Sequence, residues 1–139
     1  MSPRYLLDTN VLSEPLRPHP HKRVVEHLRR SEGLLATASI VWHELLYGAA
    51  RLPDSPKRRA IQQYLSEVVA PTIPILAYDE RAAEWHAAER SRLERAGRAP
   101  AFADGQIAAV ARVHGLVVVT RNTADYAGFE GVAVENWHR

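Results

Sequence analysis

The sequence feature that most constrains the fold is an uninterrupted apolar run near the carboxyl end, from Leu116 to Val119, which Thr120 closes. Consecutive branched side chains favour a β-strand, and a strand without a polar face is typical of a parallel sheet covered on both sides. Parallel neighbours need long crossover connections, which are usually helices. We therefore expect strands and helices to alternate along this chain.

The rest of the sequence follows this alternation. Short apolar runs predict strands at 5–7, 34–38 and 132–134, and the prolines of 71–76 indicate a brief extended segment at a sheet edge. Apolar residues at helical spacing, together with stop signals such as Gly33 and Gly115, predict helices at 21–31, 40–51, 57–70, 80–96 and 104–114. The pattern implies an α/β fold, in which a central, mostly parallel sheet is flanked by helices on both faces.

Some finer expectations concern loops and helix faces. Three prolines within 15–20 predict a loop, and 137–139 is expected to be a tail. Val25 and Val68 are expected to face inward from their helices, and Ser39 is expected to cap the helix that follows it. All histidines are interpreted as surface or packing residues, because none has the spacing of a zinc site.

Length and composition limit the remaining possibilities. The 139 residues suit one domain, 1–139, of ordinary globular composition, with 46% hydrophobic and 24% charged residues. The absence of cysteine excludes disulfides and cysteine–zinc sites and is compatible with a cytoplasmic location. No secretory signal and no membrane-spanning segment are expected. The pI of about 9.2 is a weak indication of a nucleic-acid partner.

Four acids occupy comparable places in this alternating pattern. Asp8 follows the first strand, Glu44 interrupts an apolar helix, Asp104 opens a late helix, and Asp125 follows the strongest strand. Helix capping is an alternative explanation for Asp8 and Asp104, and Glu44 could simply face solvent. Clustered carboxylates need a cation, and a set of oxygen ligands favours Mg²⁺ or Mn²⁺. Such an ion can activate water and clamp a phosphodiester.

Four motifs resemble those of a known family and appear in the family's order across essentially the whole chain. They are residues 6–13 (LLDTNVLS), 44–48 (ELLYG), 104–109 (DGQIAA) and 120–126 (TRNTADY). With them the chain resembles the PIN-domain ribonuclease toxins of type II toxin–antitoxin systems, the VapC/FitB-like family. The resemblance implies a three-layer α/β/α PIN fold with the acids gathered in one cleft.

The resemblance also assigns roles to individual residues. It implies that Asp8 and Asp104 are the main ligands of Mg²⁺, for which Mn²⁺ could substitute, and that Glu44 and Asp125 complete the catalytic set. The supporting residues, which hold waters or ligands in place, are expected to be Thr9, Asn10, Thr120 and Asn122.

The expected activity is metal-dependent endoribonucleolytic cleavage of RNA, which would arrest translation and growth, and the resemblance implies tRNA or rRNA as the substrate. The implied partners are a VapB/FitA-like antitoxin, operator DNA bound only through that antitoxin, and a second copy of the chain in a dimer or larger assembly. Two alternatives remain open at this point: a non-catalytic module that binds RNA or antitoxin, and a DNA-cleaving nuclease of related architecture.

Overall fold

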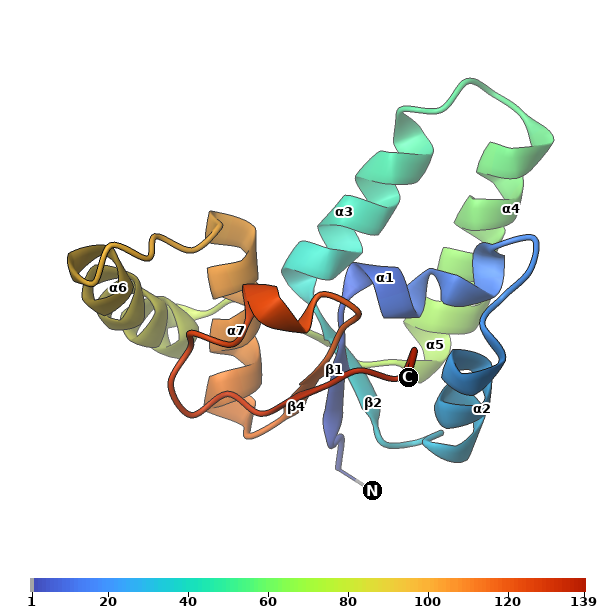
Figure 1. Ribbon diagram of the computed structural model, residues 1–139. Helices are drawn as coiled ribbons and strands as arrows, with labels where there is room; N and C mark the ends of the chain where they lie inside the picture. The colour runs from blue at the N-terminus through green and yellow to red at the C-terminus, as the bar shows by residue number, and fades with distance from the viewer. Residues whose placement is uncertain (1) are drawn as a thin grey trace.

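The computed structural model describes residues 2–139 and contains one five-stranded sheet in which all paired strands are parallel (Figure 1). The strand order is β3-β2-β1-β4-β5. The strands are β1 (Tyr5–Leu7), β2 (Leu35–Ala38), β3 (Ile75–Leu76), β4 (Val117–Val119) and β5 (Val134–Glu135). The predicted α/β class is confirmed. Of the extended segment expected at 71–76, only Ile75 and Leu76 form a strand at the sheet edge, whereas Pro71 and Thr72 belong to a helix.

The order of the strands places the first and fourth side by side at the centre of the sheet. Leu7 pairs with Thr37 of β2 on one side and with Val119 of β4 on the other. The chain proceeds outward from β1 to β3, then returns to β4 and proceeds in the opposite direction. The boundary between β1 and β4 is therefore the topological switch point, where α/β sheets bind ligands beyond the carboxyl ends of their strands.

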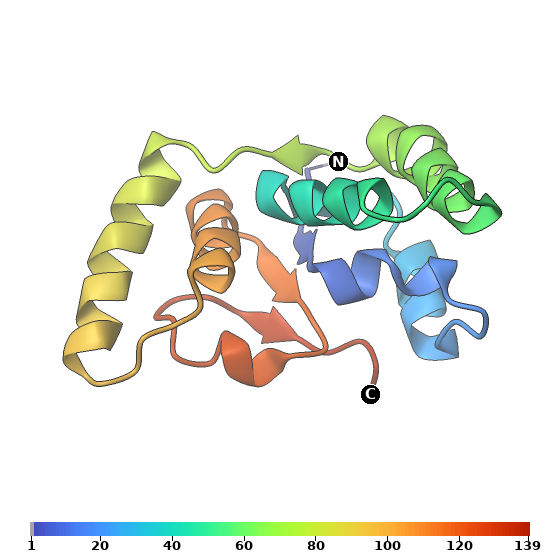
Figure 2. The same cartoon turned by 90° about the horizontal axis from the view of Figure 1, so that it is seen from above.

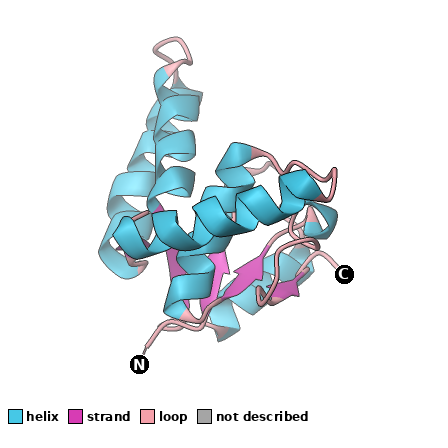
Figure 3. Cartoon of the chain, turned by 90° about the vertical axis from the view of Figure 1, so that its left-hand side faces the viewer, coloured by secondary structure: helices cyan, strands magenta, loops and turns pink. Residues whose placement is uncertain are grey.

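Helices cover the sheet in two groups. Figure 2 shows α6 and α7 on one side of the sheet and α1, α2 and α4 on the other. The helices are α1 (Thr9–Leu12), α2 (Lys22–Arg30), α3 (Ser39–Ala50), α4 (Pro56–Tyr64), α5 (Ala70–Thr72), α6 (Glu80–Arg95) and α7 (Phe102–His114). Helices α3 and α4 extend beyond the sheet as an arm, as Figures 1 and 3 show. Within residues 2–139, no helix combines the length and the apolar character needed to cross a bilayer.

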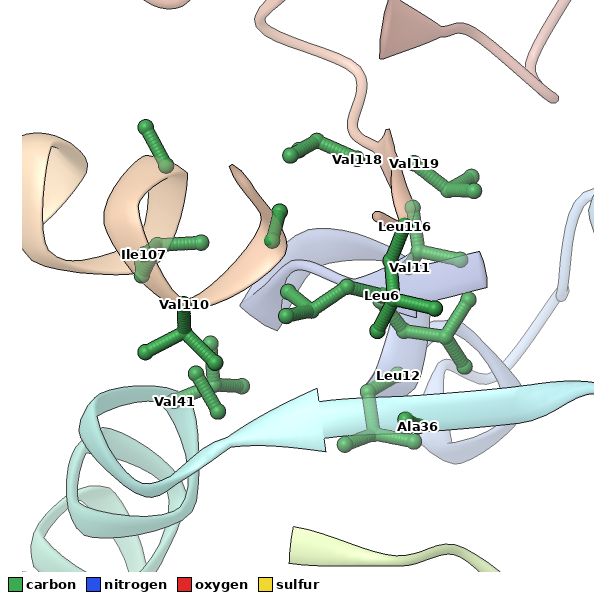
Figure 4. Close-up of a cluster of buried hydrophobic side chains, with 14 of the residues drawn as sticks. Leu6, Val11, Leu12, Ala36, Val41, Ile107, Val110, Leu116, Val118 and Val119 are labelled. Carbon is green, nitrogen blue, oxygen red and sulfur yellow. The ribbon is translucent and has the colours of Figure 1, made fainter. Parts of the chain in front are cut away.

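The core lies between these layers (Figure 4). Leu6, Val118 and Val119 of the central strands have no solvent exposure, and Ala108 and Ala111 on α7 are equally buried. The small alanine side chains let α7 approach the strands closely. Each fully buried leucine or valine contributes about 1.5–3 kcal/mol, so this packing holds the two central strand ends in place.

One predicted helix is interrupted. The expected continuous helix 57–70 is instead α4, a π-helical turn (Leu65–Val69) and α5, which includes Pro71 and Thr72. A π-turn has more residues per turn than an α-helix and so rotates the face that follows it. Val69 is consequently buried while Val68 is 51% exposed, and the prediction that Val68 faces inward was wrong.

Smaller differences concern Val25 and Ser39. Val25 is 40% exposed rather than inward, because Val24 of α2 occupies the buried face about 100° away. Ser39 is the first residue of α3 and not its cap; its hydroxyl accepts the Tyr78 N–H at 3.3 Å. For Ser39, a tertiary contact that local spacing does not contain decided the outcome.

The predicted loop and tail are both more ordered than expected. Glu14–Leu16 forms a 3₁₀ turn within the proline-rich stretch. Trp137 is only 2% exposed and stacks on His27 with ring centroids 4.7 Å apart, while His138 reaches back to Glu14. The carboxyl-terminal residues thus pack on the domain instead of forming a free tail.

Candidate active site

Asp8 is held rigidly at the carboxyl end of β1. Its side chain is 8% exposed, and its Oδ1 atom accepts the Thr9 N–H at 2.8 Å, which is the predicted helix cap. Its Oδ2 atom accepts hydrogen bonds from the hydroxyls of Thr120 at 2.8 Å and Tyr126 at 3.2 Å. Asp8 can therefore cap the helix with Oδ1 and contact the other site residues with Oδ2.

The contact between Asp8 and Thr120 follows from the sheet register. Leu7 is paired with Val119, and the Asp8 N–H donates to the Val119 carbonyl at 3.0 Å. The next residue on each strand must then lie side by side beyond the sheet. Thr120 is completely buried there, so residues 112 positions apart in the sequence meet through backbone pairing.

Asp104 lies in the first turn of α7 and is not its cap. The helix begins at Phe102, earlier than predicted, and its N-cap Ala101 makes no side-chain hydrogen bond. Burial raises the pKa of Asp104 to about 6, and the negative charges of Asp125, Asp8 and Glu44 contribute to the increase. The capping alternative for Asp104 was wrong, and the other three predicted acids are close enough to Asp104 to repel its charge.

Glu44 is exposed on α3 but is not directed away from the site. Its Oε2 atom accepts the Thr9 hydroxyl at 2.9 Å. Thr9 therefore links two of the acids: its hydroxyl donates to Glu44 on α3, and its backbone N–H donates to Asp8 at the end of β1.

Asn10 connects the turns that follow the two central strands. Its Nδ2 atom donates to the Thr120 hydroxyl at 3.3 Å, and its Oδ1 atom accepts the Arg121 N–H at 2.9 Å. Asn122 contributes its backbone N–H to the Thr120 hydroxyl at 3.1 Å, while its side chain is exposed. Three of the expected supporting residues thus interact through side chains, and Asn122 through its backbone.

Asp125 ends a short 3₁₀ turn (Thr123–Asp125) and is exposed. It lines, together with Asp104, a cleft of about 320 Å³ between the segment before α7 and the segment after β4. Its charge is the largest of the three carboxylate contributions that raise the pKa of Asp104.

Tyr126 is a site residue that sequence reasoning did not single out. It is completely buried, donates to Asp8 and lies within hydrogen-bonding reach of the Asp104 carboxylate. Burial, together with the charges of Asp8 and Asp104, raises the pKa of Tyr126 far above its ordinary value, so its hydroxyl remains a donor. The sequence shows only an aromatic residue after Asp125, and nothing local marks its hydroxyl as part of the site.

The donor set suits a hard divalent cation, although its side chains do not form a ready-made cage. Carboxylate oxygens are the ligands that Mg²⁺ and Mn²⁺ prefer, and a cation would relieve the repulsion that raises the pKa of Asp104. As the side chains stand, no three Asp, Glu or His residues within 2–139 lie close enough together to hold an ion. The residues fit such an ion in chemistry, and binding would require them to draw closer.

A parallel sheet with carboxylates converging at its switch point defines a class of α/β domains with an acidic site. The model of the PIN domain matches residues 5–131. The chain is 37% identical over 138 residues to Toxin FitB of Neisseria gonorrhoeae, covering 96% of this chain and 98% of that protein. It is 32% identical over 136 residues to the tRNA(fMet)-specific endonuclease VapC of Shigella flexneri, with coverage of 96% and 98%.

Solved structures agree with the sequence relatives. FitAB bound to an IR36 DNA fragment matches with a TM-score of 0.87 and 36% identity, covering 97% of this chain and 96% of that one. DNA-bound VapBC from Salmonella typhimurium matches with a TM-score of 0.85 and 27% identity, covering 97% and 98%. The chain belongs to the PIN-domain family and, within it, to the group of FitB and VapC toxins, which confirms the resemblance found in the motifs.

Proposed function

We propose that this protein is a metal-dependent endoribonuclease and the toxin of a type II toxin–antitoxin module. The observation that carries the proposal is the gathering of acids beyond the central strands: Asp104 and Asp125 line one cleft, and burial together with the charges of Asp125, Asp8 and Glu44 raises the pKa of Asp104 to about 6. A carboxylate perturbed in this way in a cleft is typical of a functional site. Relatives named ribonuclease or endonuclease support the same reaction class.

In this proposal the ion is held by Asp8, Asp104, Glu44 and Asp125. When bound, Mg²⁺ or Mn²⁺ would supply the activation of water and the stabilisation of charge on the phosphodiester oxygens. Asp8 is already oriented, because Thr9, Thr120 and Tyr126 hydrogen-bond to its two oxygens.

The other residues prepare the site around Asp8. Thr9 orients Glu44 through its hydroxyl, and Asn10 keeps the turns after β1 and β4 together. These contacts would hold the acids in place during in-line attack, so that little reorganisation is needed at the transition state.

The proposed substrate is an exposed loop of tRNA or rRNA. Single-stranded loops present their bases and backbone to a protein, whereas the deep groove of an RNA helix does not. The relative named as a tRNA(fMet)-specific endonuclease supports a tRNA substrate. Cleavage of such an RNA would arrest translation and growth.

The proposed partner is a small antitoxin of the VapB/FitA kind. The neighbouring structures FitAB and VapBC are complexes bound to DNA, which supports contact with operator DNA through the antitoxin. We further propose that residues 1–139 act as one domain in the cytoplasm and assemble as a dimer or larger complex with the antitoxin.

The test compares purified wild type with Asp8→Asn and Asp104→Asn on total RNA, with Mn²⁺ and with EDTA. Each substitution is expected to reduce metal-dependent cleavage by at least about 100-fold, since losing even an indirect metal contact typically costs 10–100-fold. Circular dichroism would verify that both variants are folded, and sequencing the RNA ends would identify the cleaved bond. The same variants should no longer arrest growth when expressed without antitoxin.

Three outcomes would contradict the proposal. Full cleavage by either variant would remove these acids from the reaction. RNA binding that EDTA leaves unchanged, without any cleavage in Mn²⁺, would instead support the non-catalytic module. Cleavage of DNA in preference to RNA would support the related DNA nuclease.

A further inference from the structure

The cleft beside Asp104 and Asp125 has a basic end. Arg98, from the segment between α6 and α7, lines the same cleft of about 320 Å³ as these two acids. Figure 2 shows this segment next to the one that follows β4. Residues from the two segments, including Pro100 and Gly128, form the walls.

The backbone of Arg98 is fixed by the end of α6. Gly97 adopts a positive φ of 71°, and its N–H donates to the Glu94 carbonyl at 3.0 Å. The Arg98 N–H donates to the Leu93 carbonyl at 2.8 Å. These two bonds form a Schellman motif, which fixes the position of the Arg98 Cα atom and hence the base of its side chain.

The Arg98 guanidinium lies over Gly128. Its Nη2 atom is 2.8 Å from the position that a Cβ atom on Gly128 would occupy. The Gly128 carbonyl accepts a hydrogen bond from Arg92 at 2.9 Å, which holds that loop in place. The lack of a side chain at Gly128 is therefore what leaves room for the guanidinium.

The charge of Arg98 is not used within the protein. Arg92 nearby binds the Glu89 carboxylate, whereas the Arg98 guanidinium has no ion-pair or hydrogen-bond partner among residues 2–139. Arg98 is the basic residue among those that line the cleft with Asp104 and Asp125. A planar guanidinium is suited to bidentate contact with a phosphate.

We infer that Arg98 binds a backbone phosphate of the RNA next to the scissile phosphate, and so places the scissile bond at the acids. This inference rests on the proposed function and adds a subsite to it. The ligand is a phosphodiester of a single-stranded stretch of RNA, which enters the cleft between the two segments.

Binding is tested without turnover, in EDTA and on the Asp8→Asn background, with a fluorescent single-stranded oligoribonucleotide that contains the mapped cleavage site. Arg98→Ala is expected to weaken binding about tenfold, and Arg98→Lys less, because lysine keeps the charge but not the fork. The slope of log K against log salt concentration should fall by about 0.7, the value for one phosphate contact of a single strand. Gly128→Ala should weaken binding by a smaller factor, because it displaces the guanidinium without removing it.

Arg95→Ala is the matched control. Arg95 is an exposed arginine of the last turn of α6, and it lines a different hollow with Arg90 and Glu94. Its loss removes the same charge from the protein but should leave binding within about twofold, since no phosphate contact is lost.

Kinetics and a chemical probe complete the test. With Mn²⁺ and otherwise wild-type protein, Arg98→Ala should raise KM about tenfold and leave kcat within about twofold, as expected for uniform binding. Placing one neutral methylphosphonate at successive linkages should weaken wild-type binding at one position beside the cleaved bond. With the methylphosphonate at that position, the affinity of Arg98→Ala should be no lower than its affinity for the unmodified RNA.

The outcomes separate this inference from the proposed function. If wild type cleaves RNA but Arg98→Ala behaves as Arg95→Ala in affinity and salt slope, the phosphate subsite is wrong and the nuclease stands. The inference would also be overturned if Arg98→Ala bound RNA normally but was inhibited less strongly by the antitoxin, because the cleft would then bind a protein. If wild type does not cleave RNA at all, the proposed function itself fails.

Discussion

Two carboxylates of this protein, the buried Glu14 and the half-buried Asp104, have opposite electrostatic environments. The Oε2 atom of Glu14 accepts the His21 N–H at 3.1 Å, and its Oε1 atom lies 3.0 Å from His138 Nε2 and 3.5 Å from an Arg17 nitrogen. Burial alone would raise the pKa of Glu14, but these donors and charges together lower it below its ordinary value of 4.5. Asp104 faces other carboxylates, and its pKa is raised to about 6.

The difference separates a structural acid from a functional one. Glu14 is 1% exposed and has donors on both oxygens, so its charge ties the proline-rich turn to the carboxyl-terminal residues. Asp104 is kept among like charges that a folded protein has no structural reason to gather. Active sites commonly retain such unfavourable arrangements at a cost in stability. Removing each charge should therefore change stability in opposite directions.

The largest expected effect is at Glu14. Glu14→Ala should lower the free energy of unfolding by about 3–5 kcal/mol, because it leaves buried partners without an acceptor. Urea unfolding at pH 7 measures the loss. Glu26→Ala, which breaks an exposed pair with Arg29, should cost less than about 1 kcal/mol, and an equal loss in both variants would contradict the structural role of Glu14.

The pH dependence of Glu14 has a definite sign. Its pKa is lower in the folded protein than in the unfolded chain, so its contribution is present above pH 4.5 and is lost as the pH falls below that value. The acid-side loss of stability should be smaller in Glu14→Gln than in wild type.

Asp104→Asn should have the opposite effect. The pKa of Asp104 is raised from 3.8 to about 6, so ionising it in the folded protein reduces stability as the pH rises through this window. The variant should be more stable than wild type by about 1–2 kcal/mol at pH 8 in EDTA, less than 1.36 kcal/mol for each unit of the change in pKa, because solvent screens this half-buried group. The difference should disappear below pH 4, and Asp54→Asn, at an exposed position, should show none of it.

Adding a metal ion gives a further test of the prediction for Asp104→Asn. Millimolar Mg²⁺ should raise the melting temperature of wild type at pH 8 and leave that of Asp104→Asn nearly unchanged, because binding to the folded state stabilises it. A variant that is less stable than wild type at pH 8 in EDTA would show that the acids do not repel one another as the structure indicates.

A similarly small effect on stability is expected at Tyr126. Tyr126→Phe removes a buried donor to Asp8 and should cost about 1.5 kcal/mol, while RNA cleavage should fall by about tenfold because Asp8 is less firmly oriented. The control is Tyr64→Phe, whose hydroxyl donates to the Leu12 carbonyl at 2.8 Å outside the site. It should lower stability by a similar amount without changing the activity of the folded protein, and equal activity losses in both variants would remove Tyr126 from the site.

Much of the fold was predictable because it depends on local pattern. The valine run of β4 and the apolar stretch before Asp8 predicted the two central strands. The helix predicted at 80–96 is α6, and Asp79 caps it by accepting the Ala82 N–H at 3.0 Å. Within the site, Asp8, Glu44, Asp104 and Asp125 were predicted as a group, and in the structure the charges of the other three contribute to the raised pKa of Asp104. Their role as metal ligands stays a prediction.

The residues that were missed depend on distant contacts. Tyr126 and Glu14 carry no local signal for these roles, because Asp8 and His138, which they contact, lie 118 and 124 positions away along the chain. The carboxyl-terminal residues were wrongly expected to be a tail for the same reason: Trp137 is buried through His27 and Tyr5, which are more than 100 residues away.

The sequence by itself determined the alternation of strands and helices, and with it a parallel sheet whose strand ends carry acids. This is because periodic burial and helix-stop signals act over a few residues. Only the tertiary structure decided which acid is satisfied and which is crowded. Strand register sets Asp8 beside Thr120, and the packing of α7 buries Asp104 among the other carboxylates, whereas the return of the carboxyl terminus supplies Glu14 with His138. The pKa of a carboxyl group depends on burial and on charges a few ångströms away in space, whatever their separation along the chain.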